Sequence, residues 1–574
     1  MANTSDLLQL YEFLYADLRS GNFINATKRI RTEPALSGWN KDHPGIGSDP
    51  MLLKLHAVIS SVHDGVGDFN EAAAWIYRQQ FDVKSELERD LLKPDRDTTD
   101  EHTAAERELL FARTWFVLRC AISAYRHSDF HESLSFLHIA EQASRVLMDL
   151  DQRMKEQMPW LTMDSTLLLV SVLYWRGCSL VYTTSLNDAE KSFITALDMI
   201  AKEYRSMPAG NQYKPEQLSH EEHLTGRILL GLGLAKFRQG ALTSAKSHLL
   251  AARSLLARTY KDVIRVKRAE LLLLSVERIL ASQNGELLYY DVIVPMEELL
   301  KDFSAHTAYR RRTLWTLAHA YISLSDCRWP DNPPDKCLDR AANFTREALT
   351  LCDSRTLIDL VECLVLRSRI MRKQGREKEA LHQAEEVLAG KKLNGLEVNI
   401  HWDHFPFYHT LTLIAVGHAC LKLGGKTGRR EDFEQAALAY NRAIKLPHGS
   451  ALLQGQCHLY LARAYYALQK PAFAWQQYGE WEKIQGLVES DIVRNLATAV
   501  KNELERGDTF AITTKDIPEK RAYHTLVKKL REFLIKNIEA PTQAAKADRL
   551  GIKPDRLRDW EKELINDAGR RDRT

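Results

Sequence analysis

Two short segments place residue types that can do chemistry close together in the chain. Gly425-Lys426-Thr427 supplies the glycine, cation and hydroxyl that hold nucleotide phosphates in a Gly-rich loop. That loop needs another glycine five positions earlier, where this chain has Cys420. His401-Trp402-Asp403-His404 supplies two imidazoles and a carboxylate for a metal, but the sequence indicates no third, distant ligand. We therefore interpret the first segment as an exposed loop between helices and the second as a loop with aromatic packing.

No other pattern in the chain favours catalysis. The glycines of Leu229-Leu230-Gly231-Leu232-Gly233 lack the third glycine and the strand context of a dinucleotide-binding turn. The eight cysteines occur singly and without a CxxC pair, which is typical of thiols in a reducing cytosol rather than of a zinc site or a disulfide framework. We therefore predict a protein that is not an enzyme, with no catalytic residue, no metal site and no cofactor.

The composition is that of a folded protein outside the membrane. The 574 residues include 45% hydrophobic and 27% charged side chains, and they contain no apolar run of about 18 residues that could cross a bilayer. Residues 1–6 are not basic and no apolar segment follows them, so no secretory signal is visible. These features predict a soluble, cytoplasmic protein.

The elements that must position any binding residues are helices that recur in pairs. In several turns a glycine is followed five positions later by a small residue, which allows two helices to cross closely. Examples are Gly21 to Ala26, Gly67 to Ala72, Gly240 to Ala245 and Gly375 to Ala380. This repetition predicts a solenoid in which each pair packs only against its neighbours and the stack exposes a long groove.

These phrases resemble the tetratricopeptide repeat over roughly residues 5–490. The strongest copies contain Leu173, Gly177, Ala189, Phe193 and Ala196; Leu232, Gly233, Ala245, Leu249 and Ala252; Gly417, Ala436, Tyr440 and Ala443; and Leu461, Ala462, Tyr465, Ala474 and Tyr478. Weaker copies centre on Ala26, Ala72, Ser133, Ala341 and Ala380, which makes about nine repeats. The resemblance implies an all-α solenoid that binds a protein or peptide in its groove.

The repeats are spaced less regularly than the 34 residues of that family. The intervals are 61 positions from Ala72 to Ser133 and 56 from Ala189 to Ala245, so we expect longer helices or loops. Residues 269–309 are helical in periodicity without a clear repeat signature, and we interpret them as a degenerate repeat. Aromatic residues such as Trp315 are expected in the core. Arg310-Arg311-Arg312 could line a groove for an acidic peptide or a nucleic acid, but a solvated face is the favoured interpretation.

The repeat pattern stops near residue 505. We therefore divide the chain into a solenoid (1–505), a linker (506–518) and a C-terminal module (519–574) of three helical segments. Within this module two short helices are joined by Leu550-Gly551-Ile552, where the glycine suits the end of the first helix. Two such helices predict a helix-turn-helix, whose second helix enters the DNA major groove.

The module resembles the Fis-type helix-turn-helix of bacterial transcription activators, through Ala547, Leu550-Gly551-Ile552, Leu557 and Leu564. Residues 519–574 contain 15 Lys and Arg against 10 Asp and Glu, an excess that favours an anionic partner. The resemblance implies contact with double-stranded DNA through Arg556, Arg558, Lys562, Lys528, Lys529 and Arg549.

Two functions therefore remain open. The main prediction is a regulatory protein that binds a protein partner through the solenoid and DNA through the C-terminal module. Acidic residues at Asp559, Glu561 and Glu563 on the second helix would repel phosphates, which counts against DNA contact. In the alternative the chain is a scaffold or adaptor subunit whose C-terminal module docks protein.

Overall fold

A computed structural model of the protein describes most of the solenoid and two residues beyond it. The described residues are 4–20, 23–32, 49–66, 69–76, 80–91, 100–154, 161–183, 186–206, 215–259, 263–304, 307–327, 332–353, 356–506 and 557–558. The chain divides into two units, Met1–Phe510 and Ala511–Thr574. The account below concerns the first unit, except where Leu557 and Arg558 are named.

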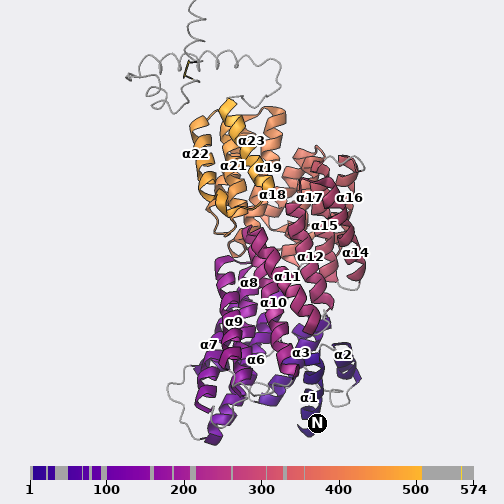
Figure 1. Ribbon diagram of the computed structural model, residues 1–574, viewed down its shortest axis with the longest axis vertical. Coiled ribbons are helices and arrows are strands. Elements are labelled where there is room, and N and C mark those ends of the chain that lie inside the picture. Colours follow the sequence, from indigo (N-terminus) through magenta and orange to yellow (C-terminus); the bar gives the residue numbers. More distant parts are fainter. Residues whose placement is uncertain are drawn as a thin grey trace, which may run out of the picture. The chain divides into compact units, whose positions relative to one another are not determined.

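The described part is built almost entirely of helices (Figure 1). The helices of the first half are α1 Thr4–Ser20, α2 Phe23–Thr32, α3 Pro50–Val66, α4 Phe69–Ala74, α5 Gln80–Leu91, α6 Asp100–Arg126, α7 Phe130–Met154, α8 Leu161–Leu180, α9 Leu186–Ser206, α10 Pro215–Gln239, α11 Leu242–Thr259 and α12 Val263–Leu280. Those of the second half are α13 Gly285–Leu287, the π-helical turn η3 Leu288–Ile293, α14 Val294–Asp302, α15 Thr307–Cys327, α16 Pro334–Thr350, α17 Leu357–Lys373, α18 Glu377–Ala389, the 3₁₀ turn η4 Trp402–His404, α19 Pro406–Thr427, α20 Arg430–Lys445, α21 Ala451–Ala467, α22 Pro471–Ile484, the 3₁₀ turn η5 Gln485–Leu487 and α23 Asp491–Arg506. None of the described helices combines the length and apolar character needed to traverse a lipid bilayer.

Successive helices pack as pairs, and the small residues predicted at their crossings lie in the second helix of each pair. All nine are at most 5% exposed: Ala26, Ala72, Ser133, Ala189, Ala245, Ala341, Ala380, Ala436 and Ala474. The predicted positions of the helix crossings are thus confirmed. The backbones approach closely there; for example, the Ser368 hydroxyl on α17 donates a 2.7 Å hydrogen bond to the carbonyl of Ala380 on α18.

Glycines on the first helix of a pair admit large side chains from the second. A Cβ built on Gly177 would lie 2.6 Å from the Phe193 ring, and one on Gly417 would lie 2.7 Å from the Tyr440 ring. These contacts are shorter than two carbon atoms tolerate, so only glycine leaves room for the aromatic ring.

The irregular spacing of the repeats is explained by helix length and, between Ala72 and Ser133, by the additional helix α5. Helices α6, α7 and α10 contain 27, 25 and 25 residues, so each crossing is followed by additional turns. The degenerate repeat expected at 269–309 is a pair whose second helix is interrupted by the π-helical turn η3 and resumes at α14 with Pro295 in its first turn.

One element breaks the all-α pattern. Strands β1 (Lys392–Leu393) and β2 (Leu396–Glu397) form an antiparallel hairpin after α18. Its two-residue turn, Asn394 and Gly395, has positive φ angles of 50° and 82°, the turn type that Asn-Gly favours. The dipeptide was a signal for this hairpin that the sequence analysis did not use.

The array also contacts itself between distant pairs. The rings of Phe130 at the start of α7 and Phe405 before α19 lie 6.1 Å apart, centroid to centroid. A Cβ on Gly240 after α10 would meet Leu452 of α21 at 3.0 Å. One buried apolar cluster runs from Leu53 in α3 to Tyr408 in α19. The prediction that each pair packs only against its neighbours is therefore wrong for α7–α10 and α19–α21, whose contacts close the array around its inner helices.

Two glycines of α19 give a matched test of the crossings. Gly417→Ala should destabilise the protein by about 1–3 kcal/mol, because the new methyl group overlaps the buried Tyr440 ring. Gly425→Ala, with no atom within 4 Å of its new Cβ, should stabilise it by up to about 1 kcal/mol, because alanine favours a helix. Chemical denaturation of both variants measures this difference, and equal effects would contradict the packing described.

Candidate binding cavity

The inner helices of the array line an open cavity of about 810 Å³. Its walls come from α6, α10, α12, α15, α17, α19, α21 and α23, together with Tyr182 after α8, so most pairs in this region contribute one helix. The side chains on these walls are of two kinds. Apolar residues of α19, α21 and α23, such as Leu411, Leu452 and Leu496, form one part, and arginines of α10, α12, α15 and α17 form another.

The cavity wall carries an excess of positive charge. Eight arginines line it, against the three carboxylates of Asp353, Asp359 and Glu362, and no lysine contributes. Arginine keeps its charge at every physiological pH and presents several N–H donors in one plane. How these charges are compensated therefore determines what the cavity can bind.

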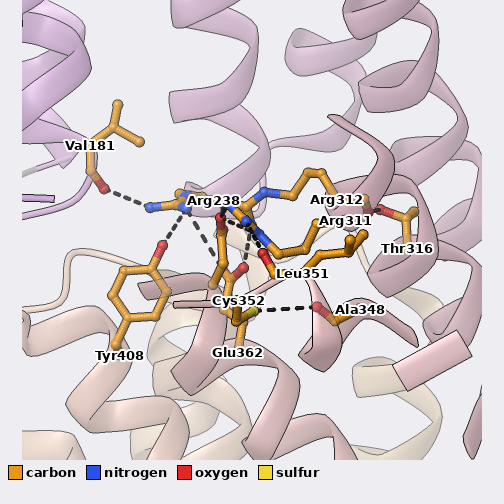
Figure 2. A network of polar contacts seen from close by, with 11 residues as sticks. Val181, Arg238, Arg311, Arg312, Thr316, Ala348, Leu351, Cys352, Glu362 and Tyr408 are labelled. Carbon is orange, nitrogen blue, oxygen red and sulfur yellow. Dashed lines mark hydrogen bonds and ion pairs between the residues drawn. The ribbon is translucent and has the colours of Figure 1, made fainter. Parts of the chain in front are cut away.

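A network of ion pairs compensates the arginines on one side of the cavity (Figure 2). Arg311 donates from Nε to Asp359 Oδ2 at 2.9 Å and from Nη1 to the carbonyl of Leu351 at 2.8 Å. Arg312 lies 2.8 Å from Asp359 Oδ1 through Nη2 and also pairs with Glu362. The two carboxylates stand three positions apart in α17, which places them on one face of the helix toward α15.

Arg238, near the end of α10, joins this network from across the cavity (Figure 2). Its guanidinium donates to the Val181 carbonyl at 2.9 Å and to the Tyr408 hydroxyl at 2.6 Å, and it lies 3.9 Å from Glu362 Oε1. The same group stands over the Tyr182 ring, 4.4 Å from its centroid, in a cation–π contact. One side chain therefore ties α10 to α17 and α19.

The charges of the network shift the pKa values of its members. Burial would raise the pKa of Asp359, but Arg312 and Arg311 outweigh burial and hold it below its usual value. Burial raises the pKa of Glu362, with Arg312 and Arg238 opposing. For Arg238, burial works against the charged form, yet Tyr408, Tyr182 and Glu362 hold its pKa above the ordinary value.

The solvated face predicted for Arg310-Arg311-Arg312 is wrong for Arg311 and Arg312, which fit the alternative of a groove lining instead. Arg311 is 5% exposed, and both side chains line the cavity. Their partners lie almost 50 positions away, so no local pattern marks the arginines as buried. The three-residue spacing of Asp359 and Glu362 in the otherwise apolar first half of α17 was the available signal, because two carboxylates on a buried face require cations.

The segment around Lys426 is helical, so its interpretation as an exposed loop is wrong. It forms the last turns of α19, which ends at Gly428 with a φ of 70°. Lys426 Nζ lies 2.7 Å from Glu377 Oε2 and donates to the Gly375 carbonyl at 3.3 Å. The lysine thus joins α19 to the start of α18.

His401 directly precedes the turn η4 and His404 is its last residue, and the structure adds a distant histidine that the sequence did not indicate. The rings of His404 and His131 on α7 lie 3.8 Å apart between centroids, and those of His401 and His404 lie 5.6 Å apart. Burial and the nearby His404 lower the pKa of His131. Among the described residues, no three His, Cys, Asp or Glu side chains are arranged to hold a metal ion.

Of the residues predicted to contact DNA, only Arg558 is described. It is exposed and follows Leu557, which is fully buried. Arg556, Lys562, Lys528, Lys529 and Arg549 lie outside the described residues, as does the linker from residue 507 to 518. Their roles stay predictions.

No model of a protein family and no curated protein matches the chain. Among solved structures, the Cut9–Hcn1 hetero-tetramer of the APC/C is similar over 86% of this chain and 96% of that one, at 12% identity and a TM-score of 0.29. The structure of Naa15/Naa10 bound to HypK-THB is similar over 95% of this chain and 100% of that one, at 12% identity and a TM-score of 0.18. A circular tandem repeat protein is similar over 89% of this chain and 98% of that one, at 14% identity and a TM-score of 0.14. The description of the fold therefore rests on the helix packing of this chain.

His448, just before the cavity residue Ser450, should make stability depend on pH. Its Nδ1 accepts the Ser450 backbone N–H at 3.1 Å, and burial lowers its pKa to about 4. The unfolded chain takes up this proton near pH 6.5, so the stabilisation is complete above pH 6.5 and is lost as the pH falls toward 4. Between pH 7 and pH 5 this histidine should account for a loss of about 2 kcal/mol in the free energy of unfolding.

His448→Asn isolates this contribution, because the amide oxygen of asparagine can accept the same N–H without titrating. Urea denaturation at pH 7 and pH 5 should show a smaller loss of stability in this variant than in the wild type. His382→Asn, on the exposed surface of α18, should retain the pH dependence of the wild type. An identical loss in His448→Asn and wild type would contradict the assignment.

Proposed function

We propose that this chain is a scaffold or adaptor that binds a protein partner, and that it has no catalytic centre of its own. The observation that carries the proposal is a cavity to which most helix pairs from α6 to α23 contribute a helix. Stacked helix pairs form extended binding surfaces of this kind from their inner helices. The resemblance of the pairs to tetratricopeptide repeats supports the same reading.

The apolar part of the cavity wall suits a segment of a partner protein. Leu411, Leu452 and Leu496 are partly buried cavity residues, and Ile492 on α23 is 42% exposed. Apolar side chains in contact with water at a concave surface are favourable contact points for a partner, because binding removes them from water. We expect the partner segment to contact α19, α21 and α23.

A pull-down from native extract with paired variants tests this function. Ile492→Asp places a charge on the apolar wall at a position exposed enough to accept it, and it should abolish retention of the partner. Ile194→Asp on α9, also 42% exposed but outside the cavity, is the matched control and should retain it. Quantitative mass spectrometry of the retained proteins, with nuclease added throughout, is the measurement.

A defined partner that is retained by the wild type and Ile194→Asp, but lost from Ile492→Asp, supports the scaffold reading. The proposal fails if Ile492→Asp retains the same proteins in the same amounts. It fails equally if no protein is retained in stoichiometric amount.

A second proposal concerns the C-terminal module. The charge excess of residues 519–574 and the Leu550-Gly551-Ile552 turn favour a helix-turn-helix that binds duplex DNA through Arg556, Arg558 and Lys562 on its second helix. Lys528, Lys529 and Arg549 would contact the phosphate backbone. In this case the chain links a protein partner to DNA.

Gel shifts with mixed genomic fragments at low salt separate the two readings of the module. The full chain should bind DNA, and its affinity should fall by more than about tenfold between 50 and 200 mM salt, because phosphate contacts release counterions. The chain ending at Pro518 and the double variant Arg556→Glu, Arg558→Glu should not bind. Equal binding by the full and shortened chains, or none by either, would leave only the scaffold function.

A further inference from the structure

Three arginines in the cavity lack the compensation that the network gives to their neighbours. Arg278 of α12 and Arg369 and Arg372 of α17 all line the cavity, and in the described part of the chain none of the three forms an ion pair with a carboxylate. We call these three residues the unpaired arginine cluster. The acid that attracts Arg369 is Asp326, whose side chain already pairs with Lys373.

Polar nitrogen atoms beside the cluster are also without partners. The Nε of Arg278, the Nε1 of Trp315 and the Nδ1 of His319 are buried, and no hydrogen-bond partner is present for them within the described residues. All three side chains line the same cavity. Buried polar groups are nearly always satisfied in proteins, and leaving one unsatisfied costs about 1–3 kcal/mol. Three such groups on one cavity wall therefore favour a ligand with several hydrogen-bond acceptors.

The positive charges of the cluster repel one another and disfavour the protonation of nearby histidines. Burial, followed by the charge of Arg369, lowers the pKa of Arg278 to about 10. Burial and Arg372 lower the pKa of Arg369. Burial and the arginines also hold the pKa values of His319 and His418 well below their usual range, so both rings are neutral at neutral pH. An anion at this place would relieve the repulsion and supply the acceptor.

We propose that the unpaired arginine cluster is a binding site for a small compound that carries two or more phosphate groups. Arg278, Arg369 and Arg372 would neutralise its charge. Trp315 and His319 would donate hydrogen bonds to its oxygens. The planar guanidinium groups match pairs of phosphate oxygens. The site lies on α12, α15 and α17, a different wall of the same cavity from the wall of α19, α21 and α23 proposed above for the protein partner.

Size and charge together define this class of ligand. The volume of about 810 Å³ lies within the range of roughly 300–1,000 Å³ that is typical of small-molecule pockets. Three uncompensated cations match a ligand with several negative charges, which a single carboxylate does not supply. A phosphoryl group also offers three acceptor oxygens in a small volume, as many as there are unsatisfied nitrogen atoms at the wall.

Isothermal titration calorimetry of the full chain with sodium tripolyphosphate tests the site directly. Trisodium citrate and sodium chloride at equal ionic strength are the comparison ligands, and thermal unfolding with each salt is the second readout. Tripolyphosphate should bind with defined stoichiometry and raise the unfolding temperature, because a ligand of the folded state stabilises it. Citrate and sodium chloride should do so at least tenfold less effectively.

Arg278→Met and Arg369→Met remove a charge while keeping most of the apolar stem. Each should weaken tripolyphosphate binding tenfold or more and leave the unfolding temperature without ligand unchanged or higher, because a repelling charge is gone. A purely structural arginine would lower that temperature. Arg369→Lys keeps the charge but loses the planar donors, so it should also weaken binding. Arg430→Met on the exposed face of α20 is the matched control and should change neither readout.

The proposal is overturned if tripolyphosphate does not bind or if citrate binds equally well. It is overturned if the cluster variants bind as the wild type does, or if a polyglutamate peptide binds more tightly than tripolyphosphate, which would identify an acidic protein segment as the occupant. It is also overturned if every cluster variant unfolds at a lower temperature without ligand and still binds tripolyphosphate as tightly as the wild type does. None of these results bears on retention of a protein partner at Ile492.

Discussion

The buried guanidinium of Arg238 holds together parts of the array that are 170 residues apart in sequence. It donates to Tyr408 of α19 and to the Val181 carbonyl, and it shares Glu362 of α17 with Arg312. Removing one partner of such a buried pair leaves an uncompensated charge, which typically costs about 3–5 kcal/mol. The network therefore forms only when α10, α17 and α19 are all in place. These contacts bring distant helix pairs of the array together around the cavity.

Helix α17 explains why the two sides of this cavity differ in charge. Asp359 and Glu362 lie in its first turns, and Arg369 and Arg372 lie in its last turns. This distribution complements the helix dipole, because carboxylates favour the N-terminus and cations the C-terminus. As a consequence, the carboxylates pair with Arg238, Arg311 and Arg312. The two arginines at the other end of α17 lie near Arg278, which carries the same charge. One helix thus builds both the compensated and the uncompensated wall.

The features that the sequence predicted correctly are local. Small residues such as Ala189, Ala245 and Ala436 stand at fixed places in short helix–turn–helix phrases, and a helix crossing depends on residues within one pair. The closing contacts depend on pairs such as Arg238 and Tyr408, for which no spacing rule exists. The same reason hid the burial of Arg311 and Arg312 and the contact of His131 with His404. A single sequence therefore indicated the repeat but neither the closure nor the cavity.

The contacts between distant helix pairs also affect how tightly the unpaired arginine cluster can bind an anion. Arg369 and Arg372 share α17 with Asp359 and Glu362, so the network that anchors the first turns of the helix also fixes the direction of its last turns. Arg278 is held opposite them by α12. Like charges on a mobile wall would move apart or turn toward bulk water, whereas charges on anchored helices stay close. An entering anion then meets donors that are already oriented, and little of its binding energy is lost in ordering them. The ion pairs of Arg238 therefore contribute to anion binding without touching the anion, because they keep the cluster in place.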